Sequence, residues 1–142
     1  MINDKIIPVS DLVVHEYVSN ENTETYTMRI PEFITNYIQK NTLGFKTKAI
    51  SSLCDIAISL IELGSVSVDD FTVNRKEISI HSMSESKKIK TTNKKMTRFH
   101  INKKTCININ RLITVGSFTS KIIVLCLIAI RYNKENRKTL LS

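Results

Sequence analysis

Residues able to bind a metal ion or act as a nucleophile are scattered along this sequence. The histidines His15, His81 and His100 lie far apart, and none has a cysteine or carboxylate at the spacing of a metal site. The three cysteines show no Cys-x-x-Cys spacing. Two of them fall among apolar residues, which is typical of buried free thiols in a reducing compartment. We therefore expect no bound metal ion and free cysteines.

Signs of catalysis are equally few. Asp69 and Asp70 are adjacent carboxylates, but they follow a helix-ending Gly64 and fit a solvated turn better than a general acid–base pair. Ser51 and Ser52 have no base beside them and fit the polar side of a helix. With three glycines in all, the chain cannot build a phosphate-binding glycine loop. We expect no enzymatic activity and no cofactor.

The charge of the chain is unevenly distributed. Residues 1–70 hold 5 Lys/Arg against 10 Asp/Glu, a net charge of −5, whereas residues 71–142 hold 16 against 3, a net charge of +13. This asymmetry favours a polyanionic partner, nucleic acid first and an anionic membrane second. A solvated basic surface is the plain alternative.

Nothing in the sequence predicts passage into or through a membrane. The longest apolar run, residues 122–130, is far short of the roughly 20 residues that span a bilayer. The first ten residues lack the basic start and apolar run of a secretory signal. We expect a cytoplasmic protein that does not act at a membrane.

An internal repeat organises the elements that must position any site. Residues 44–58 (GFKTKAISSLCDIAI) and 116–130 (GSFTSKIIVLCLIAI) are identical at eight of fifteen positions at an offset of 72. The middle identities fall at helical spacing and predict one buried helix face in each copy. The second copy is apolar all round, which predicts burial on more than one side. The identities are Gly44/Gly116, Thr47/Thr119, Ile50/Ile122, Leu53/Leu125, Cys54/Cys126, Ile56/Ile128, Ala57/Ala129 and Ile58/Ile130.

The two ends of each copy carry helix signals. The shared glycine is expected to end the preceding helix in a left-handed conformation. The shared threonine, Thr47 or Thr119, is expected to cap the repeated helix with its hydroxyl.

The stretch before the first copy predicts a strand and a helix. Polar and apolar residues alternate from residue 25 to residue 30, the period of a half-buried strand. Pro31 ends this strand and suits the first turn of an amphipathic helix, which runs to about Thr42. Leu43 and Gly44 close that helix, and the repeated helix follows to about Gly64.

A strand, a proline, a helix, a glycine turn and a capped helix together resemble the ribbon-helix-helix family of DNA-binding proteins. The matching residues are TYTMRIP at 25–31, the Leu-Gly turn at 43–44, and Thr47. Members of this family pair two such units, and the two strands form an antiparallel ribbon that enters the DNA major groove. The resemblance implies the same fold and activity here.

A second, less regular copy of the pattern precedes Gly116. Residues 97–102 alternate again, with Phe99 and Ile101 matching Met28 and Ile30 at an offset of 71. A helix from about Lys104 to Val115 is expected next. Asn102 replaces the proline, and residues 107–110 also alternate, so this strand is defined less sharply than the final helix.

The sequence thus predicts a mainly α fold with a short β-ribbon, in which two ribbon-helix-helix units of one chain form an intramolecular pseudo-dimer, as in fused members that resemble relaxosome accessory proteins of conjugative plasmids. Residues 71–82 predict a small hairpin about residues 74–77, and residues 84–95 predict a flexible basic linker. The expected segments are an N-terminal arm (1–24), a first unit (25–64), the inserted hairpin and linker (65–95), a second unit (96–133) and a basic tail (134–142).

The resemblance assigns roles to individual residues. Outward strand residues are expected to contact base edges, because arginine bonds guanine in a bidentate manner and threonine offers a hydroxyl and a methyl group. These residues are Thr25, Thr27, Arg29, Arg98 and His100. Helix starts are expected to present backbone amides and lysines to phosphates. These residues are Lys46, Thr47, Lys48, Thr119, Ser120 and Lys121.

The expected function is sequence-specific binding of double-stranded DNA without catalysis, as a transcriptional regulator or as an accessory factor in a plasmid-processing complex. Further copies of the protein on adjacent sites are a second expected partner. The alternative is a protein-interaction module, such as an antitoxin or adaptor whose basic segment binds an acidic protein.

Overall fold

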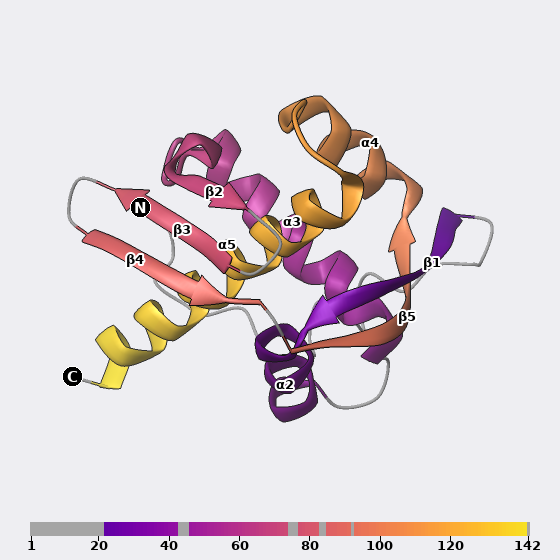
Figure 1. Ribbon diagram of the computed structural model, residues 1–142, viewed down its shortest axis with the longest axis horizontal. Coiled ribbons are helices and arrows are strands. Elements are labelled where there is room, and N and C mark those ends of the chain that lie inside the picture. Colours follow the sequence, from indigo (N-terminus) through magenta and orange to yellow (C-terminus); the bar gives the residue numbers. More distant parts are fainter. Residues whose placement is uncertain (1–21, 43–45, 74–76, 83–84, 92, 142) are drawn as a thin grey trace.

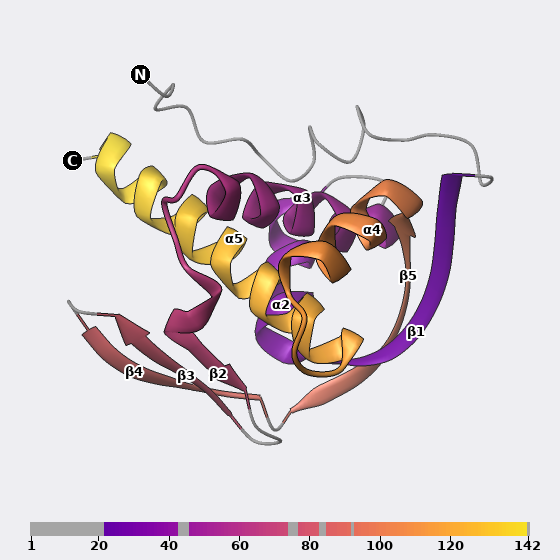
Figure 2. The ribbon, with the colours of Figure 1, turned by 90° about the horizontal axis from the view of Figure 1, so that it is seen from above.

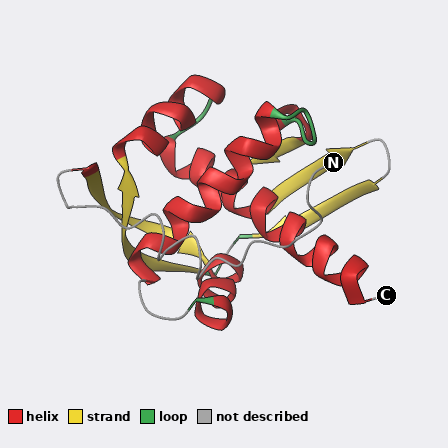
Figure 3. Cartoon of the chain, turned by 180° about the vertical axis from the view of Figure 1, so that it is seen from behind, coloured by secondary structure: helices red, strands yellow, loops and turns green. Residues whose placement is uncertain are grey.

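The computed structural model describes residues 22–42, 46–73, 77–82, 85–91 and 93–141. They form a mixed α/β fold that is mostly helical, with four α-helices and two small antiparallel sheets (Figure 1). The three-stranded sheet and the near end of the ribbon lie on one side of the helices, and the ribbon then curves around the edge of the molecule (Figure 2 and Figure 3).

The first sheet is a two-stranded ribbon. Strand β1 (Thr23–Pro31) pairs antiparallel with β5 (Lys94–Asn102) along the full length of both strands. The alternation in each strand turns Ile30, Phe99 and Ile101 toward the core, where all three are fully buried. The strand expected at 25–30 is therefore confirmed, and the one expected at 97–102 begins three residues earlier than expected.

Each ribbon strand leads directly into a helix. α2 (Glu32–Asn41) follows Pro31 and buries Ile34, Tyr37 and Ile38. α4 (Lys103–Leu112) follows Asn102 and ends three residues earlier than the sequence predicts. The strand-like alternation of residues 107–110 does not prevail, because Cys106 and Ile109 lie at helical spacing and both are buried.

The repeated helices form the centre of the core. α3 (Ala49–Glu62) packs against α5 (Phe118–Leu141), as the view from above shows (Figure 2). The helical-face identities are all buried to 1 % exposure or less, which confirms the predicted face: Ile50, Leu53, Cys54, Ala57, Ile122, Leu125, Cys126 and Ala129. Every residue from 122 to 130 is buried, as the all-round apolar pattern predicts.

The expected caps are wrong. Thr47 lies within a 3-10 turn, η2 (Lys46–Lys48), and α3 begins after Lys48 without a side-chain cap. Thr119 is already inside α5; the hydroxyl of Ser117 accepts the N–H of Ser120 instead, at 3.1 Å. Gly116 has a positive φ of 97°, but it lies in the turn before α5 and does not cap α4, whose C-terminal cap Ile113 is extended. Gly44 lies outside the described residues.

The second sheet is larger than the predicted hairpin. A 3-10 turn, η3 (Val68–Asp70), leads into β2 (Phe71–Val73), which pairs with β3 (Glu77–Ser82) as the sequence predicts. β4 (Glu85–Lys90) then pairs with β3, where a flexible linker was expected. That expectation is wrong, since residues 85–90 form a strand in which Ile89 lies opposite the fully buried Ile78.

α5 continues to Leu141 and so includes most of the segment expected as a basic tail. Asn133, just before that segment, is buried and donates its side-chain N–H to the hydroxyl oxygen of Tyr37, at 3.0 Å. This contact fixes the second half of α5 to α2. Of the expected N-terminal arm, residues 1–21 lie outside the described part of the chain.

Candidate nucleic-acid interface

The antiparallel register brings the five predicted base-contact residues onto one face of the ribbon. Thr25 lies opposite His100, and Thr27 lies opposite Arg98. Arg29 lies two residues after Thr27 on the same strand and therefore on the same face. Four of the five are exposed and His100 is half-buried. Because cross-strand partners in a ribbon share a face, these side chains form one continuous row on each strand.

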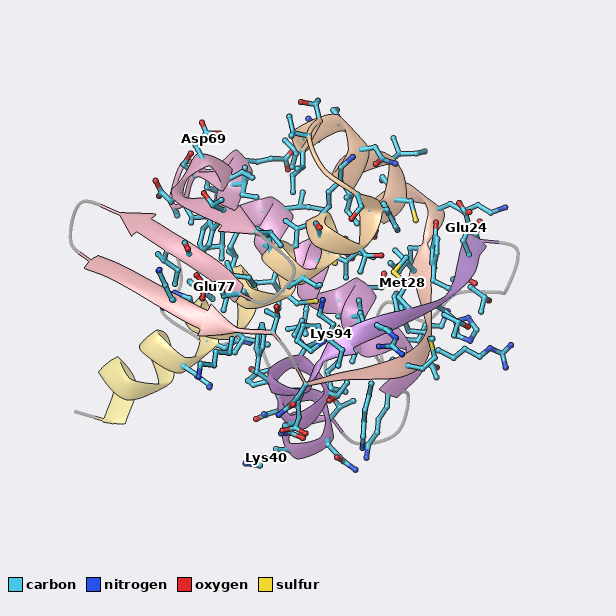
Figure 4. All side chains as sticks on the ribbon, viewed as in Figure 1. Glu24, Met28, Lys40, Asp69, Glu77 and Lys94 are labelled. Carbon is cyan, nitrogen blue, oxygen red and sulfur yellow. The ribbon has the colours of Figure 1, made fainter. Side chains whose placement is uncertain are left out.

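The inner face of the ribbon holds this row in position. The Tyr26 ring packs against Phe118 of α5, with centroids 5.1 Å apart, and against Phe99 of β5 at 6.1 Å. Met28 lies between the ribbon and the helices (Figure 4), where its sulfur accepts a hydrogen bond from the Thr119 hydroxyl at 3.4 Å. A register slip of one residue would exchange these buried groups for the polar row.

A hydrogen bond joins the two strands on the outer face. The hydroxyl of Thr25 lies 2.8 Å from Nδ1 of His100. Burial lowers the pKa of His100, and the charges of Lys48 and Arg98 lower it further, which favours the neutral imidazole. With its proton on Nε2, the ring accepts from Thr25 and keeps one N–H as a donor for an external acceptor.

The start of the first repeated helix lies beside strand β5. Lys46 and Thr47 are exposed and, with Thr97 and Arg98, line a shallow depression of about 240 Å³. A lysine and a helix start therefore flank the ribbon, as the phosphate-contact prediction requires.

Lys48 does not fit that prediction. Its side chain is only 4 % exposed, and burial lowers its pKa. The sequence placed it in a row of exposed helix-start residues, but η2 turns it inward toward the ribbon strand. In this conformation the positive charge of Lys48 contributes to lowering the pKa of His100.

The start of α5 is engaged mainly within the protein. Thr119 donates to Met28, and the Lys121 ammonium donates to the side-chain oxygen of Asn110 at 3.1 Å. Ser120 is bonded to Ser117. All three predicted residues are half-buried, so this helix start is less open than η2.

Two residues of the outer face were missed. Met96 lies opposite Arg29 and is 64 % exposed, and Lys94 lies opposite Pro31 at the end of the ribbon away from Glu24 (Figure 4). The sequence contained a signal for both residues, because every second residue of a strand lies on the same face. Extending the alternation back from Arg98 and His100 leads to Lys94 and Met96. An exposed methionine among polar residues offers an apolar surface suited to a thymine methyl group.

The adjacent carboxylates singled out in the sequence lie in one turn. Asp69 and Asp70 lie in η3, where the Asp69 N–H donates to the Ser67 hydroxyl, which is a turn as expected. In the part of the chain that the structure describes, no three His, Cys, Asp or Glu side chains are grouped to hold a metal ion. None of the described helices has the length and apolar character needed to cross a bilayer.

Comparisons of the chain with protein-family models, with curated proteins and with solved structures give no match.

Proposed function

We propose that the protein binds double-stranded DNA with sequence preference and without catalysis, through a ribbon built from two ribbon-helix-helix units of one chain. The first unit would comprise β1, α2 and α3, and the second β5, α4 and α5. One observation carries the proposal: β1 and β5, which are more than 60 residues apart in the sequence, pair antiparallel with their predicted base-contact residues on one exposed face.

The contacts between the two segments support this pairing. The start of α5 packs on β1 through Phe118 and Thr119, whereas η2, before α3, packs on β5. Each strand thus contacts the helix start of the other segment. Such an exchange is expected of two units that pair with each other, and it makes the ribbon and the α3–α5 core parts of one structure.

The ribbon has dimensions and side chains suited to the major groove, which admits a two-stranded ribbon. Arg29 and Arg98 would contact guanine edges, while Thr25, Thr27 and Met96 would contact thymine methyl groups or base acceptors. Lys46 and Thr47 would hold a phosphate beside the groove. The location of the bound DNA site decides between the two biological uses, which are transcriptional repression and assembly of a plasmid-processing complex.

Selection of bound duplexes from a random library tests this function. We expect enrichment of one site, and binding to that site should weaken steeply with salt because several phosphates are neutralised. Uniform recovery of all sequences would contradict sequence preference. Capture of an acidic protein, with no duplex bound at any salt concentration, would favour the protein-interaction alternative.

A further inference from the structure

The three-stranded sheet lies next to the near end of the ribbon, on the same side of the helices. Figures 1 and 2 both show β2, β3 and β4 adjoining the ribbon where β4 leads into β5. The junction is short, because β4 ends at Lys90 and β5 begins at Lys94. It is anchored by a 2.8 Å hydrogen bond from the Glu32 N–H to the Asn93 carbonyl. The sheet is therefore held to the ribbon end and to the start of α2.

The two faces of this sheet differ in character. The inner face carries Ile78 and Ile80, both buried, and Ile89 of β4 pairs with Ile78. Lys88 and Lys90 flank Ile89, so the strand alternation turns both to the outer face, where both are exposed. The segment from residue 87 to residue 104 contains eight Lys/Arg and no Asp/Glu, so positive charge continues from β4 into the ribbon.

The carboxylate of Glu77 reduces the positive charge of this face. Glu77 of β3 forms an ion pair with Lys88, with 3.5 Å between the carboxylate oxygen and Nζ, and lies opposite Lys90 in the register. Lys88 has 71 % of its side chain exposed, so water screens this pair and its ammonium can still approach a second anion.

We infer that the outer face of the β2–β3–β4 sheet is a second DNA contact, in which Lys88 and Lys90 bind the phosphate backbone beside the base pairs that the ribbon reads. The inference rests on the proposed function and deepens it. An evenly spaced polyanion suits two lysines on one strand face that continues into a groove-binding ribbon. The contact carries no base information, so it extends the footprint without changing the preferred sequence.

The test compares Lys88→Gln/Lys90→Gln with a matched control, Lys40→Gln/Lys134→Gln, which removes two exposed lysines from helices α2 and α5. Binding is measured on a duplex trimmed to the selected site and on one extended by about 10 base pairs, one helical turn, at each end. A Lys88→Arg/Lys90→Arg variant keeps the charge, and thermal melting verifies that all variants are folded.

We expect the extended duplex to bind the parent more tightly than the trimmed one, and the Gln variant to lose this gain. Its salt slope should fall by about 2, which amounts to about a tenfold smaller loss of affinity between about 50 and 200 mM salt. The Arg variant and the control should match the parent. Glu77→Gln should act in the opposite direction and tighten binding to the extended duplex, because it removes the acid that attracts Lys88.

Equal affinities and slopes for the Gln variant, the control and the parent, with site preference intact, would overturn the second contact and leave the proposed function standing. Absence of any duplex binding by the parent would overturn both. Lysine-dependent sedimentation with vesicles of anionic phospholipid, without an effect on DNA binding, would also overturn the inference, since the face would then serve a membrane.

Discussion

The backbone N–H of Asn102 donates a hydrogen bond to the hydroxyl of Ser51, with 3.1 Å between nitrogen and oxygen. Asn102 stands where the first segment has Pro31, at an offset of 71, and Pro31 has no N–H to satisfy. The position that corresponds to Ser51 in the second copy of the repeat is Ile123, which has no acceptor. The Asn102 N–H thus has Ser51 as its acceptor. At the corresponding positions, Pro31 lacks the N–H and Ile123 lacks an acceptor.

This relationship makes a prediction about two neighbouring serines. Ser51→Ala should lower the free energy of unfolding by about 1–3 kcal/mol, because the partly buried Asn102 N–H loses its acceptor. Ser52 is the matched control: it is equally buried, but its hydroxyl donates at 3.4 Å to the carbonyl of Lys48, the residue just before its own helix. Ser52→Ala should therefore cost less. Urea unfolding measures both, and an equal loss for the two variants would contradict the role of Ser51.

The repeated helices should carry much of the stability. Leu53→Ala and Leu125→Ala each remove a fully buried side chain and should cost about 2–5 kcal/mol. Leu63, at the end of α3, is 68 % exposed, so Leu63→Ala should change stability by no more than about 0.5 kcal/mol. Chemical unfolding compares the three. If the two core variants unfold like the Leu63 variant, α3 and α5 are not the centre of the fold.

Acid should destabilise the fold in part through His100. Because burial and nearby positive charges lower its pKa in the folded state, the unfolded chain takes up the proton first as the pH falls below about 6.5. The contribution of His100 is therefore intact above that pH and is lost as the pH falls through the folded-state pKa. Unfolding free energies at about pH 7.5 and 5.5 should differ less for His100→Gln than for the parent. An identical difference would show that His100 titrates normally.

Pairing within one chain predicts that the fold does not depend on concentration. The β1–β5 ribbon and the α3–α5 packing both join segments of the same chain, so dilution removes no partner from them. Circular dichroism and sedimentation velocity over a wide dilution range should report a folded monomer at the lowest concentration. Unfolding upon dilution would instead require pairing between chains.

The sequence predicts the elements that follow a single strong period. The alternation before Pro31 and the helical spacing of the repeat both survive in the structure, because each pattern buries one complete face. The outer face of the ribbon could be listed before the structure for the same reason. The register of the ribbon could not be predicted from the sequence, because it depends on which strand β1 pairs with.

The features that sequence reasoning missed depend on contacts between distant residues. β4 pairs with β3, where Ile89 lies opposite Ile78, and α5 continues past its apolar core to Leu141 while Asn133 bonds Tyr37. Both segments are polar and carry no period of their own. Lys48 was expected at the surface, yet a 3-10 turn buries it. For Lys48 the residue type indicates exposure, and tertiary packing overrides it.

Sequence reading by the ribbon is tested most directly by comparing Arg29→Ala with Lys46→Ala on a selected site and on a scrambled duplex, at two salt concentrations. Arg29 lies on the outer face of the ribbon, whereas Lys46 lies at the neighbouring helix start. Arg29→Ala should cost about 1–3 kcal/mol on the selected site and little on the scrambled duplex. Lys46→Ala should weaken both equally and reduce the salt slope by about 1. Equal losses on both duplexes for Arg29→Ala would contradict base reading and leave only a basic surface.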